Sequence, residues 1–314
     1  MVVRNRFPTR PSRVGAGDAV SAPSASIATV RTWGRMVKFS HSVFALPFAL
    51  TGAALAAARF GITWMQVVWV IVAMGAARNA AMGFNRLADH AIDARNPRTA
   101  ARELPRGALS RESVWTFTIL LSLLFVVASF ALSPLCGALS PLALAIIFGY
   151  SYTKRITWAS HVVLGLSLAI APVGGWLAIA GRMAWIPVFL AIAVCCWVAG
   201  FDTIYACQDT AFDRQEGLLS IPARFGVAKA LAAARVLHVL ALVAMAAVGV
   251  AAGLHGVYWI GLAVIAAVLL WEHRLVRTDD LSKIGVAFFN ANGIISVLYF
   301  CVVLAALALG KTTP

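Results

Sequence analysis

Nine apolar segments, each close to the length of a membrane span, recur between Phe39 and Leu309. A helix needs about 20 mostly apolar residues to cross a bilayer, and only helices and closed barrels satisfy their backbone polar groups in lipid. The segments are too continuous for the alternating strands of a barrel. The sequence therefore predicts an all-α, polytopic membrane protein. The expected spans are residues 39–58, 63–83, 114–133, 135–152, 160–180, 184–203, 229–252, 256–273 and 288–309.

The charge of the chain follows the spans. The sequence has 26 Lys and Arg against 12 Asp and Glu, a net charge of +14. Such a basic balance is also found in nucleic-acid-binding proteins, but here the cations stand between apolar segments, so we expect lipid as the surroundings and no nucleic-acid partner. Most of them precede the first span or lie in the even-numbered loops. The positive-inside rule then places the N-terminus and these loops in the cytoplasm.

The ends of the chain suggest its organisation. Residues 1–34 are rich in Arg, Ser, Ala and Pro, and we expect a disordered basic tail; residues 35–310 are expected to form one transmembrane domain. The cell inner membrane is the expected location. The mitochondrial inner membrane is the alternative, because an Arg- and Ser-rich, acid-poor segment also fits a transit peptide.

Acidic residues are concentrated after the second and the sixth spans. Each cluster has aspartates four residues apart, which share one face of a helix and repel each other. A divalent cation removes that repulsion, and Mg²⁺ prefers one or two carboxylates together with substrate phosphates. Solvated loop acids paired with Arg86, Arg95 and Arg214 are the simpler alternative. The metal-ligand candidates are Asp89, Asp93, Asp209 and Asp213, with Asn85 one turn before the first pair.

The matching positions of the two clusters, four spans apart, predict two four-helix halves of similar design plus a ninth helix. Lys154 and Arg155 end the fourth span on the same side as the clusters, and Arg35 and Lys38 precede the first. These cations are candidates to bind phosphate oxygens. Ordinary positive flanks of membrane spans are the alternative interpretation for all four.

The motifs resemble those of a known family. The stretch Asp202-Thr203-Ile204-Tyr205-Ala206-Cys207-Gln208-Asp209-Thr210-Ala211-Phe212-Asp213 is similar to the D-x-x-Y-A-x-x-D-x-x-x-D motif of UbiA-type intramembrane aromatic prenyltransferases. The first cluster is similar to that family's N-D-x-x-D-x-x-x-D motif, except that Arg86 stands where the family often has Asp. The resemblance covers residues 35–310.

The resemblance implies a Mg²⁺-dependent transfer of a polyprenyl group from polyprenyl diphosphate to an aromatic acid. It implies that Asp89, Asp93, Asp209 and Asp213 bind Mg²⁺ with help from Asn85. Lys154 and Arg155 would stabilise the departing diphosphate. Arg35 and Lys38 would contribute to substrate binding, and Arg86 would contact the diphosphate or the acceptor carboxylate. Asp202 and Tyr205 would orient the phenol and accept its proton.

The acceptor expected from the resemblance is 4-hydroxybenzoate, in ubiquinone biosynthesis. A dihydroxynaphthoate, in menaquinone biosynthesis, is the alternative. A phospholipid-type phosphotransferase would also be a Mg²⁺-dependent membrane enzyme, but its D-G-x-x-A-R motif is absent. A transporter or channel would place ionisable residues near the middle of the bilayer, whereas these clusters lie at the entrances of loops.

Overall fold

The computed structural model describes residues 32–36, 42–254, 256–286 and 290–310. This described part consists of helices, turns and loops without a strand, which confirms the all-α prediction. Lys38 and most of the predicted tail, residues 1–34, lie outside it. The division into a tail and a membrane domain therefore stays a prediction.

Eight described helices are long and apolar enough to cross a membrane, which supports a multi-pass membrane protein. A ninth, α2, meets the apolar criterion only over Ala45–Phe60, so the predicted count of nine is not confirmed. Each predicted span overlaps one helix. The long helices are α2 (Ser42–Phe60), α3 (Trp64–Ala88), α5 (Arg111–Leu132), α6 (Pro134–Thr153), α7 (Ser160–Ala180), α8 (Trp185–Ala206), α11 (Val227–Ala252), α12 (Val257–Leu275) and α14 (Asn292–Gly310).

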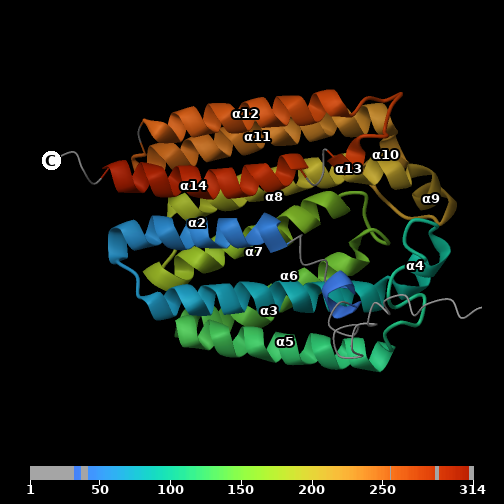
Figure 1. Cartoon of the computed structure of the whole chain (residues 1–314), viewed down its shortest axis with the longest axis horizontal. Coiled ribbons are helices and arrows are strands. Elements are labelled where there is room, and N and C mark those ends of the chain that lie inside the picture. The colour runs from blue at the N-terminus through green and yellow to red at the C-terminus, as the bar shows by residue number, and fades with distance from the viewer. Residues whose placement is uncertain (1–31, 37–41, 255, 287–289, 311–314) are drawn as a thin grey trace, which may run out of the picture.

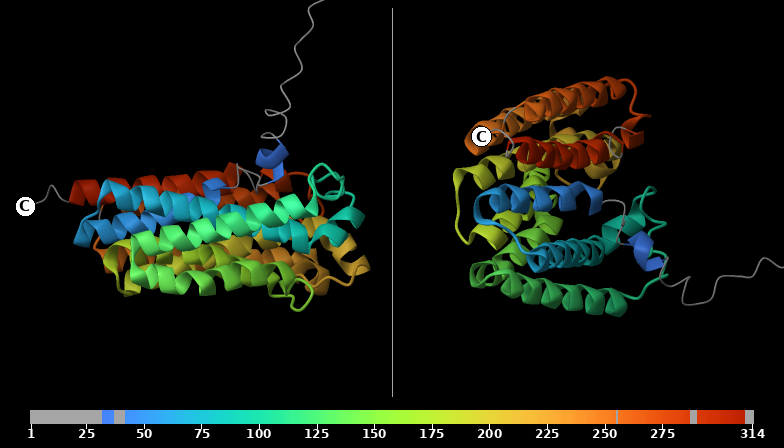
Figure 2. Two further views of the ribbon diagram at one scale, coloured as in Figure 1. Left: turned by 90° about the horizontal axis from the view of Figure 1, so that it is seen from below. Right: turned by 60° about the vertical axis from the view of Figure 1, so that its left-hand side comes forward.

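Short helices connect the long ones. The long helices lie side by side along the long axis of the molecule, and α4, α9, α10 and α13 gather at one end of the bundle (Figure 1). The view from below shows the same arrangement (Figure 2). The short elements are α4 (His90–Arg95), η2 (Cys207–Asp209), α9 (Thr210–Gln215), α10 (Ile221–Phe225) and α13 (Ile284–Val286).

The main core lies among α2, α7, α8, α11, α12 and α14. Its large buried side chains include Phe48, Trp197 and Tyr299, and the Phe48 ring contacts the rings of the other two. In a membrane the neighbouring lipid is as apolar as the core, so close packing provides much of the attraction between helices. The half of the bundle that contains α3, α5 and α6 shares less of this core, and a cavity lies beside it.

Glycines allow α2 and α7 to cross at close range. A Cβ atom on Gly175 would meet the carbonyl oxygen of Ala49, and one on Gly52 would meet the carbonyl oxygen of Pro172. Small residues at such crossings let two helix backbones approach closely. The crossing fixes α7, and with it one wall of the cavity, against α2.

Candidate active site

The two acidic clusters have the same local geometry. Asp89 and Asp209 each stand at a helix junction, with φ −94° and ψ 4° for the first and φ −98° and ψ 4° for the second. Each is followed by a six-residue helix, α4 or α9, that carries Asp93 or Asp213 in its first turn. The two junctions thus repeat one local geometry, and the division into two four-helix halves stays a prediction.

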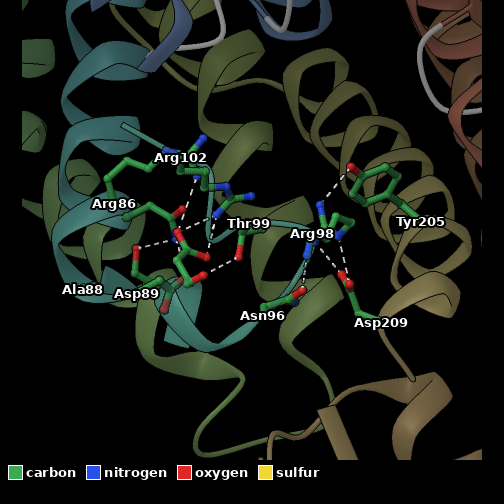
Figure 3. A network of polar contacts seen from close by, with 12 residues as sticks. Arg86, Ala88, Asp89, Asn96, Arg98, Thr99, Arg102, Tyr205 and Asp209 are labelled. Carbon is green, nitrogen blue, oxygen red and sulfur yellow. Dashed lines mark hydrogen bonds and ion pairs between the residues drawn. The ribbon is translucent and has the colours of Figure 1, made fainter. Parts of the chain in front are cut away.

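Arginine side chains join the first acidic segment (residues 85–102) to the second (residues 202–221). The Arg98 guanidinium donates to both carboxylate oxygens of Asp209, at 2.9 and 2.6 Å, and to the Tyr205 hydroxyl at 3.3 Å (Figure 3). Arg95 lies 2.7 Å from Glu216. The two segments, far apart in sequence, therefore meet at one end of the bundle (Figure 1).

The aspartates of the first segment also have partners. Arg102 donates to both carboxylate oxygens of Asp93, at 2.7 and 2.6 Å, and Arg86 lies 3.9 Å from the same carboxylate. Asp89 accepts hydrogen bonds from Arg155 and Asn85, both at 3.0 Å. Figure 3 shows Arg86, Asp89 and Arg102 together on one side of Arg98, with Tyr205 and Asp209 on its other side.

These acids are paired but not solvated. Asp89, Asp93 and Asp213 are 4, 6 and 7% exposed. An acid that only balances a nearby arginine can stay at the surface, where ion pairs form but gain little stability. The burial of these acids is therefore not explained by surface charge balance. Asp89 and Asp93 are thus buried acids paired with Arg155 and Arg102, whereas the Arg98–Asp209 pair is partly exposed, with side chains 34 and 17% exposed.

Burial makes the first segment receptive to a cation. It raises the pKa of Asp89 above its ordinary value, and the charge of Lys154 lowers it in part. A carboxylate in this position gains from a further positive charge. In the described part of the chain, no three His, Cys, Asp or Glu side chains form a metal site by themselves. Carboxylate oxygens are among the ligands that Mg²⁺ accepts, together with phosphate oxygens of a substrate.

Lys154 stands between the two acidic segments. It caps the C-terminal end of α6, and its charge acts on the carboxylates of both Asp89 and Asp213. Its backbone carbonyl accepts a hydrogen bond from Leu219, at 2.7 Å, which ties α6 to the second segment. The Lys154 ammonium is therefore placed to act on an anion held by either segment.

A cavity of about 790 Å³ extends from the acidic end into the bundle. Helices α2, α3, α5, α6, α7 and α8 form its walls. The part nearest the acidic end is polar, and the remainder is lined mainly by Ala, Leu, Ile, Val and Met. One polar end and a long apolar body suit an amphipathic substrate. The polar lining residues at that end are Asn85, Arg86, Arg102, Asp202 and Tyr205.

The cavity reaches the lipid-facing surface between α6 and α7. Leu142 and Ile146 of α6 and Leu166 of α7 line it, yet they are 59, 37 and 51% exposed. Exposed fractions this large fit a cavity that is open on this side. An apolar chain bound in the cavity can therefore extend sideways toward lipid.

Sequence reasoning missed two residues of this site. Arg78, in the interior of α3, lines the cavity near Tyr150, although we assigned it no role. A charge within an apolar span was the available signal, since such residues are generally functional. His161 contacts Asp202 at 2.7 Å; as a single histidine without ligand spacing, it gave no signal in the sequence.

The predicted substrate-binding residue Arg35 lies away from the cavity lining. Its side chain is 61% exposed and stands 3.8 Å from Glu103. Residues 32–36 pack instead against the outer side of the first acidic segment, where Met36 is buried with Leu87 and Leu104. The role predicted for Arg35 stays a prediction, as does that of Lys38.

The sequence profile of the UbiA prenyltransferase family matches residues 45–294. The chain belongs to this family and is a prenyltransferase. A relative from Xanthomonas campestris pv. campestris, named 4-hydroxybenzoate octaprenyltransferase, is 32% identical over 233 residues, which are 74% of this chain and 76% of the relative.

Solved structures have the same fold. A UbiA homologue from Aeropyrum pernix K1 superposes with a TM-score of 0.77 at 32% identity, covering 86% of this chain and 98% of the other. A homologue from Archaeoglobus fulgidus, solved with GPP and Mg²⁺ bound, gives a TM-score of 0.66 over 88% of this chain and 99% of the other. Its 18% identity supports a common fold only.

Proposed function

We propose that the protein transfers a polyprenyl group from polyprenyl diphosphate to 4-hydroxybenzoate, with Mg²⁺ as cofactor. The observation that carries this proposal is the cavity. Its polar end, lined by Asn85, Arg86, Arg102, Asp202 and Tyr205, lies beside the two acidic segments, and its body is apolar. The 4-hydroxybenzoate octaprenyltransferase relative supports the acceptor. The homologue bound to GPP and Mg²⁺ supports the donor and the metal.

In this proposal Asp89, Asp93, Asp209 and Asp213 hold Mg²⁺ together with oxygens of the substrate diphosphate. The chemistry that Mg²⁺ supplies when bound is neutralisation of the charge that develops on the diphosphate. Three of these carboxylates, those of Asp89, Asp93 and Asp209, are already paired with arginines, whereas Asp213 accepts a hydrogen bond from Ser220. Arg98, Arg102 and Arg155 would also bind oxygens of the diphosphate, and the four aspartates are the residues that would hold Mg²⁺.

The chain's own residues carry the remaining steps. The bond between the prenyl carbon and the diphosphate oxygen breaks with its electron pair on oxygen, where Lys154 and Arg155 stabilise the charge. A π electron pair of the acceptor ring forms the new carbon–carbon bond, and the ring carbon then loses its proton. Asp202, at the polar end of the cavity, accepts the phenol proton as the ring attacks, and Tyr205 orients the phenol. The proton of the ring carbon returns to the phenol oxygen when the ring regains its aromaticity. The apolar walls keep water from the allylic cation.

Arg78 is the residue we assign to the acceptor carboxylate. It lines the cavity two helical turns deeper than Asn85 and Arg86. An acceptor ring bound between these two levels, with its carboxylate on Arg78, would also lie near Tyr150 and Asp202. A guanidinium binds a carboxylate strongly in such a desolvated place. A dihydroxynaphthoate carries the same carboxylate and is the alternative acceptor.

We further propose that the acidic end faces the cytoplasm from the cell inner membrane, with the mitochondrial inner membrane as the alternative. The gathering of cations at that end supports this orientation. Arg95, Arg98, Arg102, Lys154 and Arg155 all lie there.

Purified protein incubated with polyprenyl diphosphate, Mg²⁺ and each acceptor tests the proposal, with the product identified by mass spectrometry. We expect prenylated 4-hydroxybenzoate, and no product when Mg²⁺ is removed with a chelator. Product from the dihydroxynaphthoate alone would overturn the acceptor assignment. Absence of product from every acceptor, with folded protein, would overturn the enzymatic proposal.

A further inference from the structure

A chain of hydrogen bonds connects the second acidic segment to the cavity through His161. The Nδ1 atom of His161, at the start of α7, lies 2.7 Å from Oδ2 of Asp202 on α8. The Nε2 atom accepts a hydrogen bond of 3.4 Å from the backbone N–H of Ile221, the first residue of α10. The ring is 4% exposed. His161 therefore joins three helices inside the protein.

These two contacts decide which ring nitrogen carries the proton. A backbone N–H can only donate, so Nε2 of His161 must be the acceptor. The single proton of the neutral ring then lies on Nδ1 and points at Asp202. The first N–H groups of a helix have no partner within that helix, so α10 provides a donor in a fixed position. The ring is held in one tautomer and one orientation.

The residue before Ile221 fixes α10 in turn. The Ser220 hydroxyl donates to Oδ2 of Asp213 at 2.9 Å and accepts from the backbone N–H of Ala223 at 3.2 Å. The start of α10 is thus attached to a carboxylate of the second acidic segment. The position of His161, and through it that of Asp202, depends on this attachment.

Asp202 is the cavity-lining member of the chain. Its contact with His161 uses Oδ2, which leaves Oδ1 to accept a hydrogen bond from a ligand in the cavity. We propose that His161 is a positioning residue for acceptor prenylation: it fixes the Asp202 carboxylate so that Oδ1 faces the acceptor phenol. This inference rests on the proposed function, and it adds a residue to which neither the motifs nor the comparisons assign a role.

Three substitutions separate positioning from simple packing. His161→Phe keeps a ring but removes both hydrogen bonds. His161→Asn places an amide N–H near the position of Nδ1 and retains the contact with Asp202. His161→Gln places its amide near the position of Nε2, so it retains a contact with Ile221 and loses the one with Asp202.

Two quantities are measured. The first is kcat/KM for 4-hydroxybenzoate with geranyl diphosphate and Mg²⁺, and the second is the Kd of a thiolo analogue of geranyl diphosphate that does not release its prenyl group. Loss of a hydrogen bond to a charged group predicts a decrease of about 10- to 100-fold in kcat/KM for the Phe and Gln variants. The Asn variant should stay within about fivefold of the wild type. The Kd of the analogue should stay within about threefold in all variants, because the diphosphate site is not altered.

Wild-type kcat/KM in His161→Phe would overturn the inference, and so would equal losses in the Asn and Gln variants. If His161→Phe does not fold, the comparison of Asn with Gln decides alone. A wild-type protein that prenylates no acceptor contradicts the proposed function instead. The two failures are therefore distinguishable.

Discussion

The guanidinium of Arg98 binds both carboxylate oxygens of Asp209, at 2.9 and 2.6 Å, and thereby holds the two acidic segments together. The two residues are 111 positions apart in sequence. A bidentate contact of this kind fixes both the distance and the relative orientation of its partners. Asp209 is also a proposed Mg²⁺ ligand, so Arg98 stands where substrate, metal and protein charges would meet.

Replacing Arg98 with Gln should lower kcat/KM for the prenyl diphosphate by about 10- to 100-fold, the effect of one charge-assisted hydrogen bond. The reason is the loss of the contact between the segments and of a cation for the diphosphate. Steady-state kinetics at saturating acceptor measures this. Arg277→Gln is the matched control, because Arg277 pairs with Asp279 on an exposed loop, with both side chains 73% exposed. Equal kinetics of the two variants would contradict the role of Arg98.

Asp89→Asn and Asp209→Asn should each abolish turnover. Both keep the size of the side chain and remove the charge proposed to bind Mg²⁺. Product formation over a series of Mg²⁺ concentrations measures the effect, and a melting curve checks that the variants fold. Asp279→Asn, on the exposed loop, should behave like the wild type. Full activity in both site variants would exclude these carboxylates as metal ligands.

Arg78→Met should raise the KM for 4-hydroxybenzoate by about 10- to 100-fold, because a buried carboxylate would lose its cation. The KM for the prenyl diphosphate should change little. An acceptor amide in place of the acid provides the matched comparison. The wild type should prefer the acid, and the variant should treat acid and amide nearly alike. A preserved preference in the variant would show that Arg78 does not bind the carboxylate.

Gly175→Ala should destabilise the bundle by about 1–3 kcal/mol, the typical effect of overpacking. The added methyl group would meet the carbonyl oxygen of Ala49 on α2. Gly149→Ala, on α6, is the control, since a Cβ atom there has open space and Ala favours a helix by about 1 kcal/mol over Gly. Melting temperatures in detergent should fall for the first and hold or rise for the second. The opposite order would contradict the close crossing of α2 and α7.

Local features of the sequence predicted much of this protein correctly. The lengths of the apolar segments located the long helices, and the four-residue spacing of the aspartates identified the two acidic segments, although it did not predict the helix junctions at Asp89 and Asp209. Both depend on interactions within a few residues along the chain, such as backbone hydrogen bonds and helical periodicity. The family resemblance then gave the class of enzyme, which the family match confirms.

Tertiary structure decided which side chains meet. The sequence offered Arg86, Arg95 and Arg214 as partners for the acids, whereas Arg98, Arg102 and Arg155 make the closest contacts with Asp209, Asp93 and Asp89. The burial of Asp89 and Asp93, the position of Arg78 in a cavity and the contact of His161 with Asp202 follow from how helices distant in sequence pack. Spacing along one segment determines which residues lie on the same face of a helix. Only the packed bundle determines which residues that face contacts.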